Sequence, residues 1–364
     1  MRKTGGTGFT QSARLTGRLR IGGVAAAILG LAVHGFPNNA RADEGGVSFW
    51  VPGFFGSLAA TPLTPGFSFA NIYYHTSVSA GGNVAFARQV SRGNITANFT
   101  GGVNANLDAR ADLYFAIPGY TFATPVLGGQ ANVLLIVPYG RNRVSVDATL
   151  AGALGPFPFT VSGGRTDEVT GFGDLVPQFN LRWNEGVNNF LVYATGNLTI
   201  GRYDPSRLAN LGIGHNAIDV GGAYTYFNPQ TGYEFSAALG FTYNFENVHT
   251  DYQNGVDMHL DLGASRFVTK QLQLGLVGYW YNQLSCDSGA GDRVGCFESR
   301  VFGIGPQIGY VIPISKDVQG YLNLKGYKEF AAENRPDGWN VWLTFAISPA
   351  ARQEAAAKRP MITK

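Results

Sequence analysis

The chain has 364 residues, of which 14% are charged and 13% are aromatic, and it contains 50 glycines. An ordinary soluble domain has about 25% charged residues, so this composition argues against a soluble enzyme. The first 42 residues carry six of the 27 Lys and Arg and none of the 24 Asp and Glu. The remainder therefore has 21 basic and 24 acidic residues, a balance that gives no support to nucleic-acid binding.

Residues 1–42 have the pattern of an export signal. A basic stretch precedes the apolar residues 21–33, and Ala40-Arg41-Ala42 supplies the small-x-small pattern of a cleavage site. The apolar stretch is shorter than the about 20 residues that a membrane-spanning helix needs, which disfavours the alternative of a retained membrane anchor. We expect the mature chain to begin at Asp43 after cleavage near Ala42.

Apolar and polar residues alternate strictly over residues 103–115 (VNANLDARADLYF). Side chains of a strand point alternately to its two faces, so this pattern predicts a strand with one apolar and one polar face. The same period recurs over residues 233–246. Such runs exceed the about 5–6 residues of a typical globular strand and reach the about 9–11 residues that cross a bilayer at a tilt.

We predict twelve strands, with fourteen as the alternative. They cover residues 67–79, 103–116, 131–148, 169–183, 189–200, 217–227, 233–245, 258–267, 271–283, 297–312, 319–330 and 339–348. Long connections, such as 149–167 and 201–216, alternate with short ones, such as 184–188 and 268–270. Outer-membrane barrels have long loops outside the cell and short periplasmic turns. The predicted fold is therefore an all-β, antiparallel up-and-down barrel over residues 66–349, located in the outer membrane of a Gram-negative bacterium.

Aromatic residues cluster near the ends of the predicted strands, where the interface between lipid and water favours them. We expect them to form girdles at the two membrane surfaces. The residues are Tyr224, Tyr226, Phe227, Tyr279, Trp280, Tyr281, Trp339 and Trp342.

Two segments flank the predicted barrel. Residues 43–65 are rich in glycine and aromatic residues, and they are predicted to fold into the barrel as a partial plug. A disordered lead-in and an extra strand are the alternatives. Residues 350–364 form a polar tail that we expect in the periplasm. The candidate plug residues are Phe49, Trp50, Phe54 and Phe55.

Several motifs resemble one family. Residues 203–212 (YDPSRLANLG), 224–247, 321–330 and 335–344 are similar to segments of the SphA-type outer-membrane protein family, also labelled the meta-pathway of phenol degradation family. The resemblance extends over essentially the whole mature chain. It implies a barrel that takes up aromatic or lipid-like hydrophobic compounds, and it does not imply ring-cleavage chemistry by the protein itself.

Ten charged residues lie on the polar faces of the predicted strands. An Arg or Lys that faced lipid at the membrane midplane would cost about 2–4 kcal/mol. We therefore expect these side chains to face the lumen, where they would pair with one another or set selectivity. They are Arg110, Asp112, Asp174, Arg182, Glu234, His259, Asp261, Arg300, Lys325 and Glu329.

Cys286 and Cys296 lie in one polar stretch, and in an exported protein they would most simply pair. The five histidines lack the spacing of metal ligands. The glycines of residues 303–309 are not followed by a predicted helix, which a dinucleotide site requires. We predict neither a metal site nor a cofactor.

The predicted function is a passive channel for the diffusive uptake of small hydrophobic or aromatic compounds, and not an enzyme. The competing hypothesis is a structural barrel whose lumen is closed by side chains. A third is an outer-membrane acyl hydrolase in which His75 and Ser77 share a strand face. The expected partners are outer-membrane lipid, the transported compound and the barrel assembly machinery, with no nucleic acid; the sequence sets no oligomeric state.

Overall fold

The structure is a computed structural model that describes residues 49–81, 100–154, 157–292, 296 and 298–350. The predicted export signal and all of the predicted tail beyond Ala350 lie outside these residues. No helix of the described part is long and apolar enough to cross a membrane. The described strands are β1 (Gly66–Gly81), β2 (Thr100–Thr121), β3 (Gln130–Leu154), β4 (Phe157–Phe172), β5 (Val176–Glu185), β6 (Asn188–Gly196), β7 (Ala217–Phe227), β8 (Tyr233–Asn244), β9 (Asp257–Phe267), β10 (Leu272–Gln283), β11 (Arg300–Pro313), β12 (Val318–Glu333) and β13 (Asp337–Pro349).

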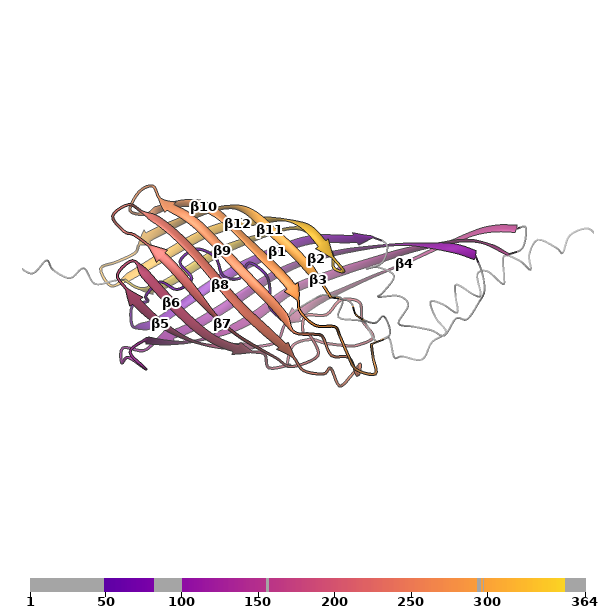
Figure 1. The fold of residues 1–364 in the computed structure, drawn as a ribbon, viewed down its shortest axis with the longest axis horizontal. Helices are drawn as coiled ribbons and strands as arrows, with labels where there is room; N and C mark the ends of the chain where they lie inside the picture. Colours follow the sequence, from indigo (N-terminus) through magenta and orange to yellow (C-terminus); the bar gives the residue numbers. More distant parts are fainter. Residues whose placement is uncertain (1–48, 82–99, 155–156, 293–295, 297, 351–364) are drawn as a thin grey trace, which may run out of the picture.

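These strands form a closed antiparallel barrel (Figure 1). The ring closes where β1 pairs with β13, with Phe69 opposite Ile347. β3 pairs with β5 through residues 130–136 and with β4 through residues 139–154. β4 and β5 therefore share one position along β3, so twelve strands close the ring and β4 is an extra strand. The predicted twelve-stranded barrel is confirmed.

The predicted loop over residues 149–167 is wrong, because most of it is a β-hairpin. β3 continues to Leu154 and β4 begins at Phe157. Together with the first half of β2, these strands form a hairpin extension (residues 100–112, 141–154 and 157–170) that projects beyond the barrel at the right of Figure 1. Its glycines and prolines suggested a loop, but cross-strand backbone pairing and hydroxyl pairs such as Ser145–Thr166, at 2.9 Å, hold it as a sheet.

The wall at β8 has its apolar side chains outside and its polar side chains inside. Along β8, Leu239 and Phe241 are 41% and 42% exposed, whereas Glu234 is 4% and Thr242 is 0% exposed. This polarity is the reverse of a water-soluble fold. It is stable where the outer surface contacts hydrocarbon, because apolar side chains then meet lipid and polar ones are excluded from it.

Exposed aromatic side chains mark the two edges of the apolar band. Tyr114, Tyr139 and Phe172 lie side by side on β2, β3 and β4 toward the end of the barrel with the long loops, which we assign to the cell exterior. Phe67 and Tyr310 are exposed near the opposite end. These positions suit interfacial girdles.

Not all of the aromatics predicted for the girdles point outward. Trp280 and Trp339 are exposed, but Tyr279, Tyr281 and Trp342 are buried inside the barrel at 3%, 1% and 0% exposure. Consecutive side chains of a strand face opposite sides, so a run of three aromatics necessarily divides between lipid and lumen.

We expect Leu239→Arg to destabilise the folded barrel by about 2–4 kcal/mol in a bilayer, because the side chain would place a guanidinium in hydrocarbon. Denaturant unfolding in lipid vesicles measures the difference. The matched control is Leu127→Arg, since Leu127 is 84% exposed in the turn between β2 and β3. Equal stability of the two variants would contradict a lipid-facing Leu239.

Candidate functional site

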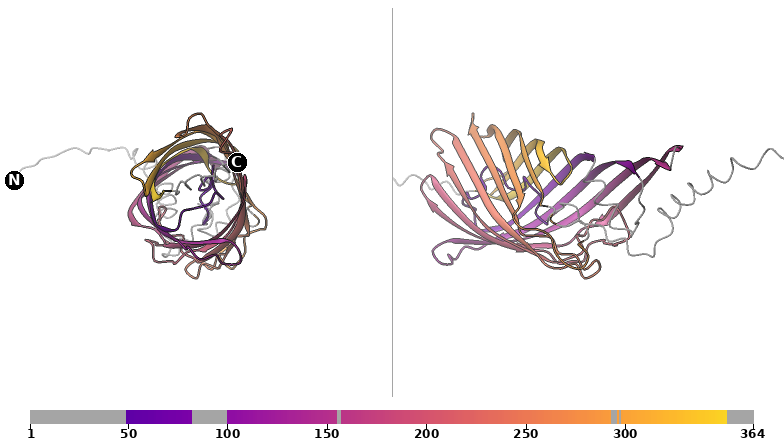
Figure 2. Two further views of the ribbon diagram at one scale, coloured as in Figure 1. Left: turned by 90° about the vertical axis from the view of Figure 1, so that its left-hand side faces the viewer. Right: turned by 45° about the vertical axis from the view of Figure 1, so that its right-hand side comes forward.

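The interior of the barrel holds residues 49–65, which we call the inner segment. The view along the barrel shows this indigo segment inside the ring of strands (Figure 2, left). It contains all four candidate plug residues, and Trp50 and Ala60 are 5% and 0% exposed. The segment joins no strand. Because buried backbone N–H and C=O groups must still find partners, its placement depends on side chains of the wall.

Two oppositely charged wall residues bind the backbone around Gly53. Asp261 accepts hydrogen bonds from the N–H groups of Gly53, at 2.8 Å, and Phe55, at 3.1 Å. Lys325 donates to the carbonyl oxygens of Gly53, at 2.5 Å, and Phe55, at 2.8 Å. Both wall side chains are buried. The carboxylate thus satisfies the donors of this turn and the ammonium satisfies its acceptors, through charge-assisted hydrogen bonds.

Side chains of the wall also bind the backbone of residues 58–63 of the inner segment. Glu234 accepts a hydrogen bond from Leu58 N–H at 2.9 Å, and Thr225 Oγ1 accepts one from Ala60 N–H at 3.0 Å. Gln130 binds both backbone groups of Leu63. The attachments therefore continue along the segment toward the start of β1.

Gly53 fits its position for a conformational and a steric reason. Its φ of 87° lies in the left-handed region, which glycine adopts without strain. A Cβ atom there would stand 3.0 Å from the ring of Tyr327 and 3.2 Å from that of Tyr279. The wall therefore approaches the inner segment closely at this turn.

An aromatic cluster holds residues 50–55 of the inner segment against the wall. The ring of Trp50 stacks on His259, with centroids 3.9 Å apart and an interplanar angle of 10°. His259 Nε2 lies 3.0 Å from Asp219 Oδ2 and 3.2 Å from the hydroxyl of Tyr193. Phe55 also packs against Tyr193. Asp219 was not among the predicted site residues, although it lies on the polar face of its strand.

Three more of the predicted lumen residues are inward or buried. Asp174, between β4 and β5, accepts hydrogen bonds from the N–H groups of Gly201, at 2.9 Å, and Ile213, at 3.1 Å. Glu329 accepts one from the hydroxyl of Tyr279 at 2.6 Å. Arg182 lies at the periplasmic end of β5. The inward residues do not form one centre, because they are spread along the height of the barrel.

Arg110 and Asp112 point outward, contrary to the expectation of a lumen position. They lie on the outer face of the hairpin extension, beyond the row of Tyr114. The inner face there is apolar: Leu107 and Val146 pack with Ala209 of the loop between β6 and β7. Above the lipid, water covers the outer face and a loop covers the inner one, so the polarity is that of a soluble protein.

Arg300 is also outward, contrary to expectation, and pairs with Glu333 at the exterior end of β11 and β12. His75, the residue of the hydrolase hypothesis, shares the outward face with Asp112, and its Nδ1 lies 2.7 Å from Asp112 Oδ1. In the described structure no hydrogen bond joins His75 to Ser77, so the contact that would activate a serine nucleophile is missing there.

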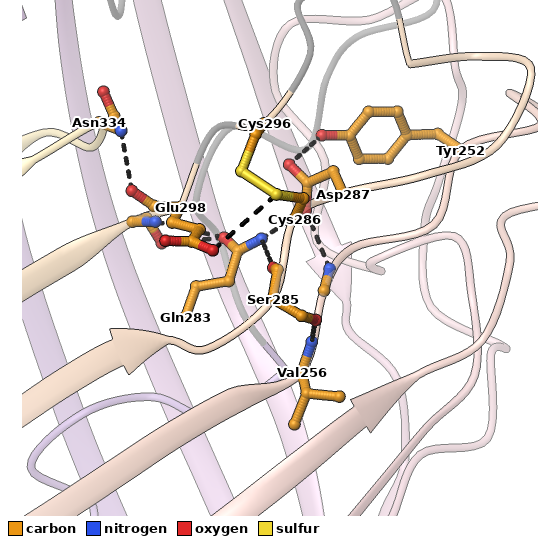
Figure 3. The surroundings of a disulfide bond; sticks show 11 residues. Tyr252, Val256, Gln283, Ser285, Cys286, Asp287, Cys296, Glu298 and Asn334 are labelled. Atoms are coloured by element: carbon orange, nitrogen blue, oxygen red, sulfur yellow. Dashed lines mark hydrogen bonds between the residues drawn. A yellow bond between two sulfur atoms is a disulfide. The ribbon is translucent and has the colours of Figure 1, made fainter.

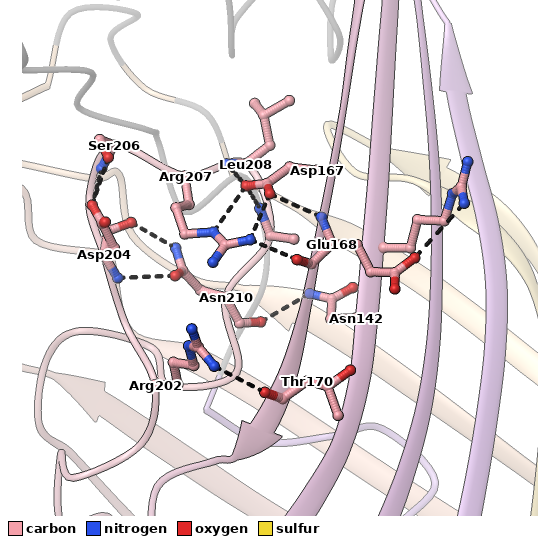
Figure 4. Close-up of polar contacts among 12 residues, drawn as sticks. Asn142, Asp167, Glu168, Thr170, Arg202, Asp204, Ser206, Arg207, Leu208 and Asn210 are labelled. Atoms are coloured by element: carbon pink, nitrogen blue, oxygen red, sulfur yellow. Dashed lines mark hydrogen bonds and ion pairs between the residues drawn. The ribbon is translucent and has the colours of Figure 1, made fainter.

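The loop between β6 and β7 (residues 197–216) is fastened to the hairpin extension (Figure 4). Asp167 of β4 accepts hydrogen bonds from Arg207 Nη2, at 2.6 Å, and from the N–H group of Leu208, at 3.0 Å. The bond from Arg207 lowers the pKa of Asp167 to about 2. Sequence reasoning missed this pair because Asp167 fell in a predicted loop, although Arg207 lies in the motif YDPSRLANLG.

Cys286 and Cys296 form a disulfide in the connection between β10 and β11 (Figure 3). Asp287, next to it, accepts hydrogen bonds from the amide of Gln283, at 2.6 Å, and from Gly255 N–H, at 2.9 Å. These bonds join two neighbouring loops at the exterior end. The sulfur atoms near Glu298 are bonded to each other, so they are not the thiolates that a metal would need.

The family model described as putative MetA-pathway of phenol degradation matches residues 73–345. The chain belongs to this family. The match confirms the family resemblance of the sequence motifs. A search of curated proteins finds no match.

Solved structures of two bacterial proteins are similar to this chain. An outer membrane channel from Pseudomonas putida F1 is 13% identical, with a TM-score of 0.57, and the alignment covers 83% of this chain and all of that one. A FadL homologue from Pseudomonas aeruginosa is 9% identical, with a TM-score of 0.38 and coverage of 86% and 97%. The first likeness supports the barrel fold. With its lipid-facing apolar band, this family member is a barrel of the Gram-negative outer membrane.

We expect Lys325→Met to loosen the inner segment, because it leaves backbone carbonyls without a donor whose hydrogen bonds are each worth about 1.5–3 kcal/mol. Single-channel conductance in planar bilayers should rise. Lys328→Met is the matched control, three residues along β12 on the exposed side of the wall. If the two variants conduct alike, Lys325 does not hold the segment in place.

The attachment of the loop to Asp167 should weaken in acid. The pKa of about 2 lies below the ordinary value of about 3.9, so the stabilisation is fully present above about pH 4 and is lost as the pH falls toward 2. Hydrogen exchange of residues 203–211, corrected for intrinsic rates, should show this loss. In Asp167→Asn we expect low protection already at pH 6; protection equal to wild type would refute the assignment.

Proposed function

We propose that this protein is a channel through which small hydrophobic or aromatic compounds diffuse across the outer membrane. The observation that carries the proposal is the inner segment. It occupies the barrel without joining the sheet, and it is held by side chains such as Asp261 and Lys325. Such a segment can move without breaking the strand pairing of the ring. A barrel with a purely structural role has no need of it.

The lining of the barrel supports a small and partly apolar solute. Tyr74, Phe115 and Trp342 form an aromatic surface around Phe54. Polar side chains, among them Asn180, line other parts of the interior. Binding sites for small molecules combine apolar and aromatic walls with a few polar groups. The family description, which concerns phenol degradation, favours aromatic compounds as the substrate class.

The competing hypotheses differ in what they need from the structure. A structural barrel would keep its lumen closed under all conditions, so loosening the inner segment would have no effect on permeation. An acyl hydrolase would need a serine hydrogen-bonded to a histidine, and the described residues pair His75 with Asp112 instead.

Uptake measurements in cells with and without the gene test the proposal. The compounds are a labelled aromatic acid, a long-chain amine and a fatty acid. We expect gene-dependent uptake of the aromatic acid, because the aromatic lining of the barrel favours an aromatic solute. Uptake should be faster in cells that carry Lys325→Met. Unchanged uptake of all three, with heat-modifiable protein present in the outer membrane, would overturn the channel and favour the structural barrel.

A further inference from the structure

Three arginines gather on the outer face of the hairpin extension, and we call them the arginine patch (Arg110, Arg141 and Arg143). Arg110 of β2 lies directly opposite Arg143 of β3, and side chains directly opposite each other on antiparallel strands share a face of the sheet. Arg141 is two residues from Arg143 along β3, so it points to the same side. All three residues are exposed, with 53% and 52% of the side chains of Arg141 and Arg143 accessible. Their guanidinium groups are therefore open to molecules outside the barrel.

One acidic residue, Glu168 of β4, serves two of these arginines. Its carboxylate accepts a hydrogen bond from Arg141 Nη2 at 2.5 Å, and Arg143 Nη1 lies 3.7 Å away. Exposed ion pairs hold their partners weakly, because water and salt screen them. A single carboxylate thus leaves positive charge in the arginine patch unbalanced.

Asp112, the other acidic residue at this level, is engaged by β1. It accepts a hydrogen bond from the hydroxyl of Tyr73 at 2.7 Å, and His75 Nδ1 lies 2.7 Å from it. In the part of the chain that the structure describes, the side chain of Arg110 has no ion pair or hydrogen bond, and the residue opposite it is the like-charged Arg143. Like charges directly opposite each other destabilise a sheet. An anion from outside the chain would relieve this repulsion.

The arginine patch lies just above the apolar band. Tyr114, Tyr139 and Phe172 form the exposed aromatic row that precedes it, and such rows mark the interface between lipid and water. Arg141 and Arg143 follow Tyr139 by two and four residues, about 7 and 14 Å along the strand. With strands tilted by about 35–45°, these steps correspond to heights of about 5–10 Å. The headgroup region extends about 5–7 Å beyond the hydrocarbon on each side.

The sign of the charge on this face changes with height. The arginines occupy the two rows next to the aromatic row, whereas the exposed residues Asp108 and Asp147 lie farther along the hairpin extension, away from the membrane. Positive charge is thus concentrated at the level of the outer-leaflet headgroups. This arrangement suits an anionic lipid beside the wall better than a soluble anion that approaches from above.

We propose that the arginine patch binds the phosphate groups of lipopolysaccharide, the lipid of the outer leaflet. A planar guanidinium matches a phosphate through two parallel hydrogen bonds, and basic clusters at headgroup level bind anionic lipid headgroups. A phosphate shared by Arg110 and Arg143 replaces their mutual repulsion by attraction to a common partner. The acyl chains then run along the exposed rings of Tyr139 and Phe172. This inference goes beyond the channel function and does not depend on which compound is transported.

Titration of the purified barrel in detergent with diphosphoryl lipid A, followed by native mass spectrometry, tests the site. We expect at least tenfold weaker binding to the double variant Arg110→Gln/Arg143→Gln than to wild type, because two charge-assisted contacts are lost. Monophosphoryl lipid A, which keeps the acyl chains but has one phosphate fewer, should bind wild type more weakly than the diphosphoryl form. The matched control is Arg266→Gln/Lys270→Gln, which removes the same charge from exposed residues at the periplasmic end of β9 and should bind as wild type does.

The conservative variant Arg110→Lys/Arg143→Lys keeps the charge, and we expect it to bind lipid A more tightly than the glutamine variant. Heat-modifiable migration establishes that each variant is folded. Equal binding to wild type and the glutamine variant overturns the site. An equal loss in the periplasmic control would show an effect of net charge alone, and it would also overturn the site. Competition by inorganic phosphate as strong as by lipid A would show a site for free anions and overturn the assignment to a lipid.

Discussion

The structure depends on the closure of the sheet between β1 and β13. Hydrocarbon offers no hydrogen-bond partners, so every backbone N–H and C=O group of the wall must be paired within the protein. The antiparallel register from Phe69 opposite Ile347 to Ser79 opposite Asp337 supplies this pairing at the seam. Side chains are then free to place apolar groups outside and polar groups inside, an arrangement that an open sheet in water could not maintain.

The same requirement explains the polar interior. The inner segment is irregular, and irregular backbone at membrane depth is tolerated only when it is buried in protein or lines a cavity. Asp261, Lys325, Glu234 and Thr225 provide the partners that a strand would have found in a neighbouring strand. Inward charges that would be costly in lipid therefore organise the interior of the barrel.

Much of the barrel was predictable because lipid enforces a strict period of two. That period defined β7 with its observed limits and identified Glu234, His259, Asp261, Lys325 and Glu329 as inward. It could not show where a strand leaves the lipid, so Arg110, Asp112 and Arg300 were assigned to the wrong side. The hairpin extension was missed because glycine and proline mask its pairing, and the attachment of the inner segment to Asp261 and Lys325 depends on contacts that only the folded chain defines.

The change of polarity on the outer surface of β2 also fixes how deep the protein sits. Tyr114 is the last outward aromatic residue before Asp112 and Arg110. Moving the barrel inward by four strand residues, about 14 Å along the strand, would bring Arg110 to the level that Tyr114 has in this position. The cost of a lipid-facing cation rises from about 0–1 kcal/mol near the interface to about 2–4 kcal/mol at the midplane, so sinking is increasingly opposed from the exterior side, while the apolar band opposes rising. The polarity of the outer surface thus fixes how deep the barrel sits in the membrane, so its two open ends keep constant heights relative to the two leaflets.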